Sequence, residues 1–104
     1  MTEQSERRRS PRMALEADVQ FRRRREAHYA IKMHDLTPEG CRIASPERLD
    51  RGELVWVQLP SLESLSAHVK WTRAWQSGVE FDRPMHVAVH DMIAARLAPA
   101  KARA

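Results

Sequence analysis

The sequence predicts a mainly β protein: a small six-stranded antiparallel β-barrel with a C-terminal α-helix and a flexible N-terminal arm. Three observations predict this fold. Apolar and polar residues alternate along several short segments, turn residues separate these segments, and helical spacing of apolar residues occurs only near the end of the chain. At 104 residues, the chain has the length of one domain with a small core.

Residues 1–12 are the predicted arm, because they contain almost no apolar side chains. The first 25 residues hold eight arginines against four acids, whereas residues 26–104 hold ten basic and ten acidic side chains. The net charge of +4 therefore comes from the first quarter of the chain. Arginine outnumbers lysine fifteen to three, and guanidinium groups suit bidentate contacts with phosphate and with guanine.

The first two strands are predicted to form a hairpin. Their apolar side chains recur at every second position, at Leu15, Ala17, Val19 and Phe21 and again at Tyr29, Ile31 and Met33. The charged stretch RRRRE between them is too polar for a core and is expected at the hairpin tip. Pairing Val19 with Tyr29 keeps the apolar side chains on one face and places Met13 opposite Asp35. A slip of the register by two residues would still leave the end of the arm beside the DLTPEG turn.

Four shorter strands complete the predicted barrel, which spans residues 13–83. They lie around Cys41 and Ile43, in ELVWVQLP, in the alternating segment from Leu65 to Trp71, and in SGVEF. Trp56 and Trp71 lie in alternating strands and are expected to pack in the core. Cys41 is expected to be a small buried residue.

Residues 84–98 are the predicted helix, and residues 99–104 its frayed tail. Asp82 can act as a cap, Pro84 suits a first turn, and the apolar residues that follow have helical spacing. His86 and His90 lie four residues apart and could in principle hold zinc. Because no third ligand is evident, we interpret them as part of a solvated helix face and expect no metal.

Several classes of protein are disfavoured by the sequence. No apolar run approaches the about 18 residues of a membrane span, and no hydrophobic stretch follows the basic N-terminus as in a secretory signal. A single cysteine allows no disulfide within the chain. We therefore expect a cytoplasmic protein without membrane insertion. No Ser–His–acid set has a readable spacing, so we do not expect an enzyme.

Candidate binding residues gather in the HDLTPEGCRI segment and in the arm. Asp35 could accept two hydrogen bonds from the Watson–Crick edge of a guanine, Thr37 offers a hydroxyl, and Gly40 permits close approach of the backbone. Arg8 and Arg12 could chelate a phosphate or grip the O6 and N7 atoms of guanine. A ligand with both guanines and phosphates would use all of these groups. Without the arginines, an ordinary turn shaped by its own side chains would be the better interpretation.

The pair Arg8-x-x-x-Arg12, followed by Asp35-x-Thr37-x-x-Gly40, resembles the PilZ domain, the bacterial receptor module for cyclic di-GMP. The signature of that family is an RxxxR arm and a [D/N]xSxxG turn. An Asp-x-[Ser/Thr]-x-x-Gly pattern is expected by chance only about 0.01 times in this composition. The resemblance continues through RGELVWVQLP, AHVKW and GVEF and covers roughly residues 6–83. Thr37 stands where the family usually has serine, which keeps the hydroxyl but adds a methyl group that could crowd the ligand.

The resemblance implies a PilZ-like barrel that binds cyclic di-GMP, does no chemistry and needs no cofactor. The ligand-binding residues that it implies are Arg8, Arg9, Arg12, Asp35, Thr37, Gly40 and Gly78. Gly78 also stands inside a predicted strand, which indicates a bulge or a close backbone approach. We expect the arm to become ordered around the ligand phosphates. An effector protein, for example in motility or surface attachment, would then read the change.

Two alternatives remain open. The chain could be a nucleotide-independent adaptor of the same family that docks on proteins, although its intact motif argues against this. It could also be an Arg-armed nucleic-acid-binding module, with Trp56, Trp71 and Trp75 as a stacking platform. The balanced charge over residues 26–104 makes nucleic acid an unfavoured partner.

Overall fold

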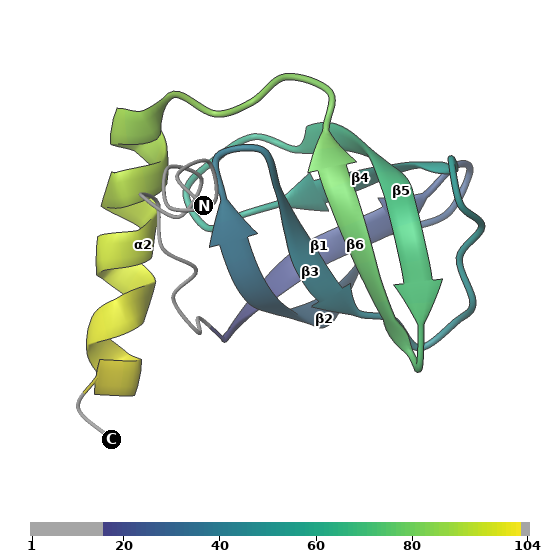
Figure 1. Ribbon diagram of the computed structural model, residues 1–104, viewed down its shortest axis with the longest axis horizontal. Helices are drawn as coiled ribbons and strands as arrows, with labels where there is room; N and C mark the ends of the chain where they lie inside the picture. The colour runs from purple at the N-terminus through teal and green to yellow at the C-terminus, as the bar shows by residue number, and fades with distance from the viewer. Residues whose placement is uncertain (1–15, 103–104) are drawn as a thin grey trace, which may run out of the picture.

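The computed structural model describes residues 16–102, which form six antiparallel strands and one helix. The strands are β1 (Ala17–Arg23), β2 (Tyr29–Thr37), β3 (Gly40–Ala44), β4 (Leu54–Gln58), β5 (Leu65–Arg73) and β6 (Gln76–Phe81), and the helix is α2 (Val87–Ala102). The strands close into a barrel in the order β1-β2-β3-β6-β5-β4, and α2 lies at one end of it (Figure 1). The predicted six-stranded barrel with a C-terminal helix is therefore confirmed.

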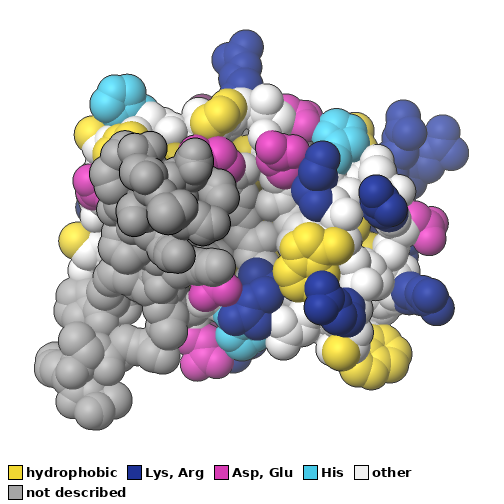
Figure 2. Space-filling model, viewed as in Figure 1, with side chains coloured by type: hydrophobic (Ala, Val, Ile, Leu, Met, Phe, Trp, Pro, Cys, Tyr) yellow, Lys and Arg dark blue, Asp and Glu magenta, His cyan; other side chains and the backbone are white. Residues whose placement is uncertain are grey.

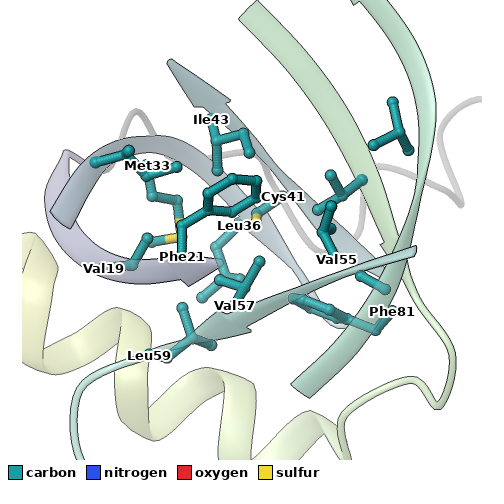
Figure 3. Close-up of a cluster of buried hydrophobic side chains, with 14 of the residues drawn as sticks. Val19, Phe21, Met33, Leu36, Cys41, Ile43, Val55, Val57, Leu59 and Phe81 are labelled. Carbon is teal, nitrogen blue, oxygen red and sulfur yellow. The ribbon is translucent and has the colours of Figure 1, made fainter. Parts of the chain in front are cut away.

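The barrel interior is filled by the inward-facing apolar side chains that the alternating pattern predicts. The largest fully buried ones include Phe21, Met33, Leu36 and Ile43. Figure 3 shows these side chains converging from strands on different sides of the barrel. Because the interior is packed with side chains, a ligand site has to lie on the outer surface.

The pairing of β1 with β2 is shifted by two residues from the predicted register. Val19 lies opposite Ile31 rather than Tyr29, and Phe21 lies opposite Tyr29. The rings of Phe21 and Tyr29 meet edge to face with their centroids 5.7 Å apart, a favourable geometry for two aromatic rings. A shift of two residues leaves the same side chains facing the core, so the alternation alone does not distinguish the two registers.

Two β-bulges interrupt the alternation of side chains. The extra residue is His34 in β2 and Lys70 in β5. A bulge turns the residue after it to the opposite face of the sheet. Asp35 and Trp71, which simple alternation would place in the core, therefore both point outward.

The prediction that Trp56 and Trp71 pack in the core is wrong. Trp71 follows the bulge in β5 and is 36% exposed. Trp56 lies on the outer face of β4 because its neighbours Val55 and Val57 occupy the core positions. The guanidinium of Arg22 lies 3.9 Å from the centroid of the Trp56 ring and covers it.

Helix α2 begins at Val87, three residues later than predicted. The residues before it make other contacts, since the N–H of Met85 donates to the carbonyl of Pro38 over 2.8 Å. His86 is the N-terminal cap, because its Nδ1 atom accepts the N–H of Ala88 at 3.0 Å.

The helix also continues beyond its predicted end at residue 98, so that the first residues of the predicted tail, 99–102, are helical. Ile93 is buried against the barrel, and Val89 and Leu97 pack beside it. No helix in the part of the chain that the structure describes is long and apolar enough to cross a membrane.

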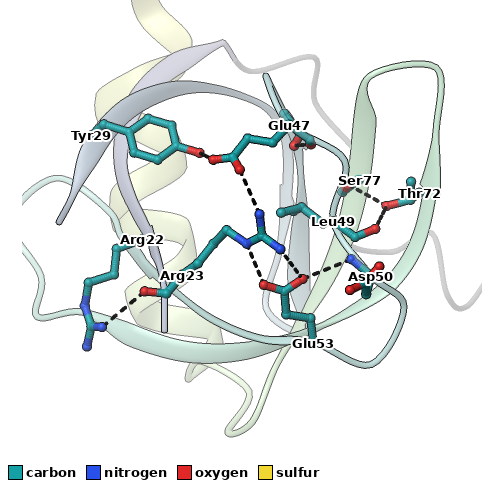
Figure 4. Close-up of polar contacts among 10 residues, drawn as sticks. Arg22, Arg23, Tyr29, Glu47, Leu49, Asp50, Glu53, Thr72 and Ser77 are labelled. Atoms are coloured by element: carbon teal, nitrogen blue, oxygen red, sulfur yellow. Dashed lines mark hydrogen bonds and ion pairs between the residues drawn. The ribbon is translucent and has the colours of Figure 1, made fainter. Parts of the chain in front are cut away.

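A polar network joins the end of β1 to the segment between β3 and β4 (Figure 4). Arg23 Nε donates to Glu53 Oε2 over 2.6 Å, and its Nη1 atom donates to Glu47 over 2.7 Å. The other oxygen of Glu47 accepts the hydroxyl of Tyr29 at 3.1 Å. Burial by itself would raise the pKa of Glu53, but the hydrogen bonds from Arg23 and from a backbone N–H outweigh it and lower that pKa. Burial and the contact with Glu47 raise the pKa of Tyr29 to about 12.

Candidate functional site

Two neighbouring rows of residues cross the outer face of β2, β3, β6 and β5. The first row consists of Asp35, Arg42, Gly78 and Trp71, and the second of Thr37, Gly40, Glu80 and His68. Each residue is the cross-strand partner of the next one in its row. Residues from four strands that are far apart in the sequence therefore form one surface.

The first row is held together by a chain of polar contacts. Arg42 Nε donates to Asp35 Oδ2 over 2.9 Å, and the Nη1 atom of Arg42 donates to the side-chain oxygen of Gln76. Both partners of this ion pair are only partly exposed. The carboxylate of Asp35 is thus held through Oδ2. Its other oxygen, Oδ1, accepts no hydrogen bond from residues 16–97.

The second row begins at the turn between β2 and β3. Thr37 Oγ1 accepts the N–H of Glu39 at 3.2 Å, so the hydroxyl shapes the turn. A Cβ atom at position 40 would lie 3.1 Å from Glu80 Cα and closer still to the carbonyl oxygen of Val79. Only glycine permits this approach of β3 to β6, which explains why the motif needs Gly40.

The backbone carbonyls of this turn are bound to the C-terminal part of the chain. The Leu36 carbonyl contacts His90 Nε2 at 3.2 Å, and the Glu39 carbonyl accepts the N–H of Phe81 at 2.8 Å. His90 is 6% exposed, so the interpretation of both helix histidines as a solvated face is wrong for His90. Its other ring nitrogen, Nδ1, lies 3.0 Å from Asp91.

Trp71 covers Gly78 on the neighbouring strand. A Cβ atom at position 78 would lie 2.5 Å from Trp71 Cε2 and closer still to Trp71 Nε1. The absence of a side chain at Gly78 therefore leaves room for the indole ring next to the backbone of β6. The guanidinium carbon of Arg73 lies 5.2 Å from the centroid of the same ring.

These residues border an open groove of about 460 Å³ on the outer face of the barrel. Its charged side chains are the carboxylates of Asp35, Glu39 and Glu80 and the cations of Arg42 and Lys70. Lys70 pairs with Glu80 over 3.3 Å. Figure 2 shows the side of the barrel on which β3, β6 and β5 lie, with acidic and basic side chains interspersed. The groove by itself has no excess of positive charge.

The predicted site residues divide into two groups. Asp35, Thr37, Gly40 and Gly78 all line this groove. Arg8, Arg9 and Arg12 lie outside the described residues, and their part in the site stays a prediction.

Arg42 and Trp71 also line the groove, but neither was among the predicted cyclic di-GMP-binding residues. Arg42 occurs two positions after Gly40 in β3, on the same face, and this spacing could have indicated it. Trp71 could not be found by alternation, because the bulge before it changes the face on which it lies.

Cys41 borders the groove and is buried, as predicted. Burial raises its pKa to about 12, so the thiol stays protonated and unreactive at neutral pH. Among the residues whose placement is described, no three His, Cys, Asp or Glu side chains are grouped so that they could hold a metal ion.

The chain matches the family model described as PilZ domain over residues 6–98. Its structure is similar to the crystal structure of the PilZ domain of CeSA from a cellulose-synthesizing bacterium, with a TM-score of 0.57 and 11% sequence identity. That alignment covers 86% of this chain and 97% of the CeSA domain. At this level of identity, the likeness shows a shared fold. No curated protein sequence matches the chain.

Proposed function

Because the chain belongs to the PilZ domain family, a family of cyclic di-GMP receptors, we propose that its outer groove binds cyclic di-GMP. The observation that carries this proposal is the convergence of Asp35, Thr37, Gly40 and Gly78 on one groove together with an exposed indole. Domains of this family are typically non-catalytic binding modules. The ligand would therefore act as a signal and not as a substrate.

Guanine recognition is assigned to Trp71 and Asp35. Trp71 offers a flat ring in the groove, on which a base can stack. Asp35 offers a carboxylate oxygen that is free to accept hydrogen bonds from a guanine, because Arg42 occupies only the other oxygen. Arg42 thus acts as a positioning residue for Asp35. The hydroxyl of Thr37 and the backbone near Gly40 would shape the base-binding end of the groove.

Phosphate binding is assigned to the arm. The groove carries three carboxylates against two cations, so it cannot by itself neutralise a ligand with two negative phosphates. Strand β1 begins at Ala17, which lies opposite Met33, two positions before Asp35. The five Cα–Cα steps from Arg12 to Ala17 can span about 17 Å, and this length supports contacts of Arg8, Arg9 and Arg12 with a ligand in the groove.

The consequence of binding would be closure of the arm over the groove. The phosphates reduce the repulsion among the clustered arginines, so that an arm bound to the barrel becomes favourable only when the ligand is present. The closed arm creates a surface that the free protein does not have. An effector protein reads this surface, which makes the chain a receptor and adaptor.

Calorimetric titration of the full chain tests this proposal. We expect saturable binding of cyclic di-GMP with a Kd of about 1 μM or below, weakened by added salt. Plain GMP should not saturate the site over the same concentration range. Replacement of Arg12 by alanine should weaken binding about 30-fold, since it removes charge-assisted hydrogen bonds worth about 2 kcal/mol.

Arg83→Ala is the matched control, because Arg83 is an exposed arginine in the connection between β6 and α2 and does not line the groove. This variant should bind as the wild type does. Absence of binding heat with cyclic di-GMP, or equal losses for the Arg12 and Arg83 variants, would contradict the proposal.

A further inference from the structure

The hairpin between β5 and β6 ends in an exposed tryptophan. Arg73 pairs with Gln76, so the connection has only two residues, Ala74 and Trp75. Both have positive φ angles, 48° for Ala74 and 64° for Trp75. Positive angles at both positions are characteristic of a type I′ turn, for which Asn-Gly is preferred. Trp75 is 70% exposed.

A bulky side chain is unfavourable at this position for two reasons. A positive φ angle strains a residue with a large side chain, and an indole in water loses the benefit of burial. With 70% of Trp75 exposed, little of its side chain is buried against the barrel. The contact that holds the turn, from the Ser45 N–H to the Trp75 carbonyl over 2.9 Å, is made by the backbone and not by the indole. Unfavourable backbone geometry of this kind is concentrated at functional sites.

Two grooves meet at Trp75. One, of about 370 Å³, is largely apolar and is lined by Ala30, Ile31, Ala44 and Pro46. The other, of about 300 Å³, is more polar and is lined by residues that include Arg48, Arg73, Thr72 and Gln76. Trp75 lines both grooves, as does Ser45. A bound segment could place an apolar side chain on one side of the indole and polar groups on the other.

The polar groove has unpaired positive charge. Arg48 and Arg73 form no ion pair with any carboxylate in the described part of the chain. The one carboxylate that lines this groove, Glu47, is bonded to Arg23 at 2.7 Å and to Tyr29 at 3.1 Å. Figure 2 shows Lys and Arg side chains gathered at the end of the barrel away from α2, with exposed hydrophobic side chains between them.

We propose that the β5–β6 hairpin tip is a docking site for an acidic segment of a partner protein. An apolar side chain of that segment packs on Trp75 from the Ala30, Ala44 and Pro46 side. Neighbouring carboxylates pair with Arg48 and Arg73. Aromatic and arginine side chains of this kind commonly dominate the energy of protein interfaces. The docking site adjoins the outer groove, because Arg73 lies over the Trp71 ring and Gln76 accepts a hydrogen bond from Arg42.

Charge favours an acidic protein segment at the hairpin tip over a second copy of the chain and over nucleic acid. A second copy of the chain is disfavoured because each copy carries a net charge of +4 and the two would repel. Nucleic acid is disfavoured because only two cations line the polar groove, whereas nucleic-acid binding commonly neutralises about 6–10 phosphates. An acidic peptide needs only a few ion pairs around one apolar anchor.

The test measures fluorescence anisotropy of labelled peptides added to the full chain. The probe is a peptide of about twelve residues, rich in Asp and Glu around one central Leu; its counterpart replaces every acid by the corresponding amide. We expect the acidic probe to bind about tenfold more tightly than the amide probe. Trp75→Ala and Arg48→Glu should each weaken binding of the acidic probe about tenfold. Arg83→Glu makes the same charge change beyond the opposite end of β6 and should leave binding of the probe unchanged.

Several outcomes would overturn the proposal. One is a lack of saturation below about 1 mM probe, and another is equal binding by the wild type and Trp75→Ala. Tighter binding of an oligo(dT) strand of the same length would assign the tip to nucleic acid instead. Self-association in analytical ultracentrifugation that Trp75→Ala abolishes would assign it to a second copy. The Ala74→Asn/Trp75→Gly variant, which suits the turn, separates loss of the anchor from misfolding.

Discussion

Asp35 is held in place by Arg42 before any ligand arrives. The 2.9 Å bond to Arg42 Nε fixes one carboxylate oxygen, and Gln76 fixes the guanidinium in turn. A side chain that is already oriented loses less conformational entropy when it binds a ligand. Asp35 is therefore part of a network with Arg42 and Gln76, and of these three residues only Asp35 belongs to the sequence motif.

Substitution of Gly78 by alanine tests whether the Trp71 ring contributes to ligand binding. In Gly78→Ala, the new methyl group would occupy the space of the Trp71 indole and push the ring off β6. We expect the affinity for cyclic di-GMP to fall by about 1–3 kcal/mol, the usual contribution of one stacked base. Calorimetric titration measures the loss, and tryptophan fluorescence reports the displaced ring.

Gly52→Ala is the control for this substitution. Gly52 has a φ angle of +88° and no atom within 4 Å of the position of a Cβ. Alanine there strains the backbone and lowers the free energy of unfolding by about 1 kcal/mol, but it displaces no ring. If both alanine variants lost affinity equally, the loss would reflect general destabilisation and not the position of Trp71.

Two β-bulges determine which side chains of β2 and β5 lie in the candidate site. One extra residue in β2 and one in β5 turn Asp35 and Trp71 outward on the same face of the barrel. In a regular strand, each would compete for a core position already filled by neighbouring apolar side chains. The two bulges lie in the strands that form the outer limits of the first row, so they define where the groove begins and ends.

The β5–β6 hairpin is expected to be more stable without its tryptophan. Replacing Ala74-Trp75 by Asn-Gly supplies residues suited to positive φ angles at both positions. We expect the free energy of unfolding to rise by about 1 kcal/mol, measured by chemical denaturation. A decrease would mean that Trp75 contributes to folding, which would remove the argument that its exposed position serves binding.

At the scale of the whole molecule, the network around Arg23 joins β1 to the segment between β3 and β4 at two positions, Glu47 and Glu53. The hydrogen bonds to Glu53 and Glu47 also raise the pKa of Arg23 beyond its usual value. Both partners in the Arg23–Glu53 pair are mostly buried. Removal of one partner would leave a poorly solvated charge without its counterion.

Glu53 makes the stability of the molecule depend on pH. Its pKa in the folded protein is lowered, so the unfolded chain binds its proton more readily. The stabilisation is therefore present above the ordinary glutamate pKa of about 4.3 and is lost as the pH falls through the folded value. We expect Glu53→Gln to lower the free energy of unfolding by about 1 kcal/mol at neutral pH. This variant should also lose less stability than the wild type as the pH falls below about 4.3.

Denaturation midpoints measured across this pH range check the prediction. Glu63→Gln is the matched control, since Glu63 is exposed and lies outside the network. It should leave the pH dependence unchanged. An unchanged pH dependence in Glu53→Gln would show that other groups govern acid unfolding.

Much of this molecule can be read from the sequence. The alternation of apolar and polar residues predicted the strands. The turns between these strands predicted an antiparallel barrel, and the barrel is closed. The motif identified Asp35, Thr37 and Gly40, the resemblance of the GVEF strand added Gly78, and these four residues lie together. Arg8 and Arg12 of the RxxxR motif, and Arg9 beside them, stay predictions. These features are recognisable because each depends on residues that are near one another in the chain.

Other features required the tertiary structure. The register of β1 with β2, the outward positions of Trp56 and Trp71, and the burial of His90 depend on contacts between segments far apart in the sequence. Local alternation fixes which residues can face the core, but it does not fix where an extra residue enters a strand. Pairing between distant strands decides that, because only the paired sheet determines which side chains fit the interior and which remain for the surface.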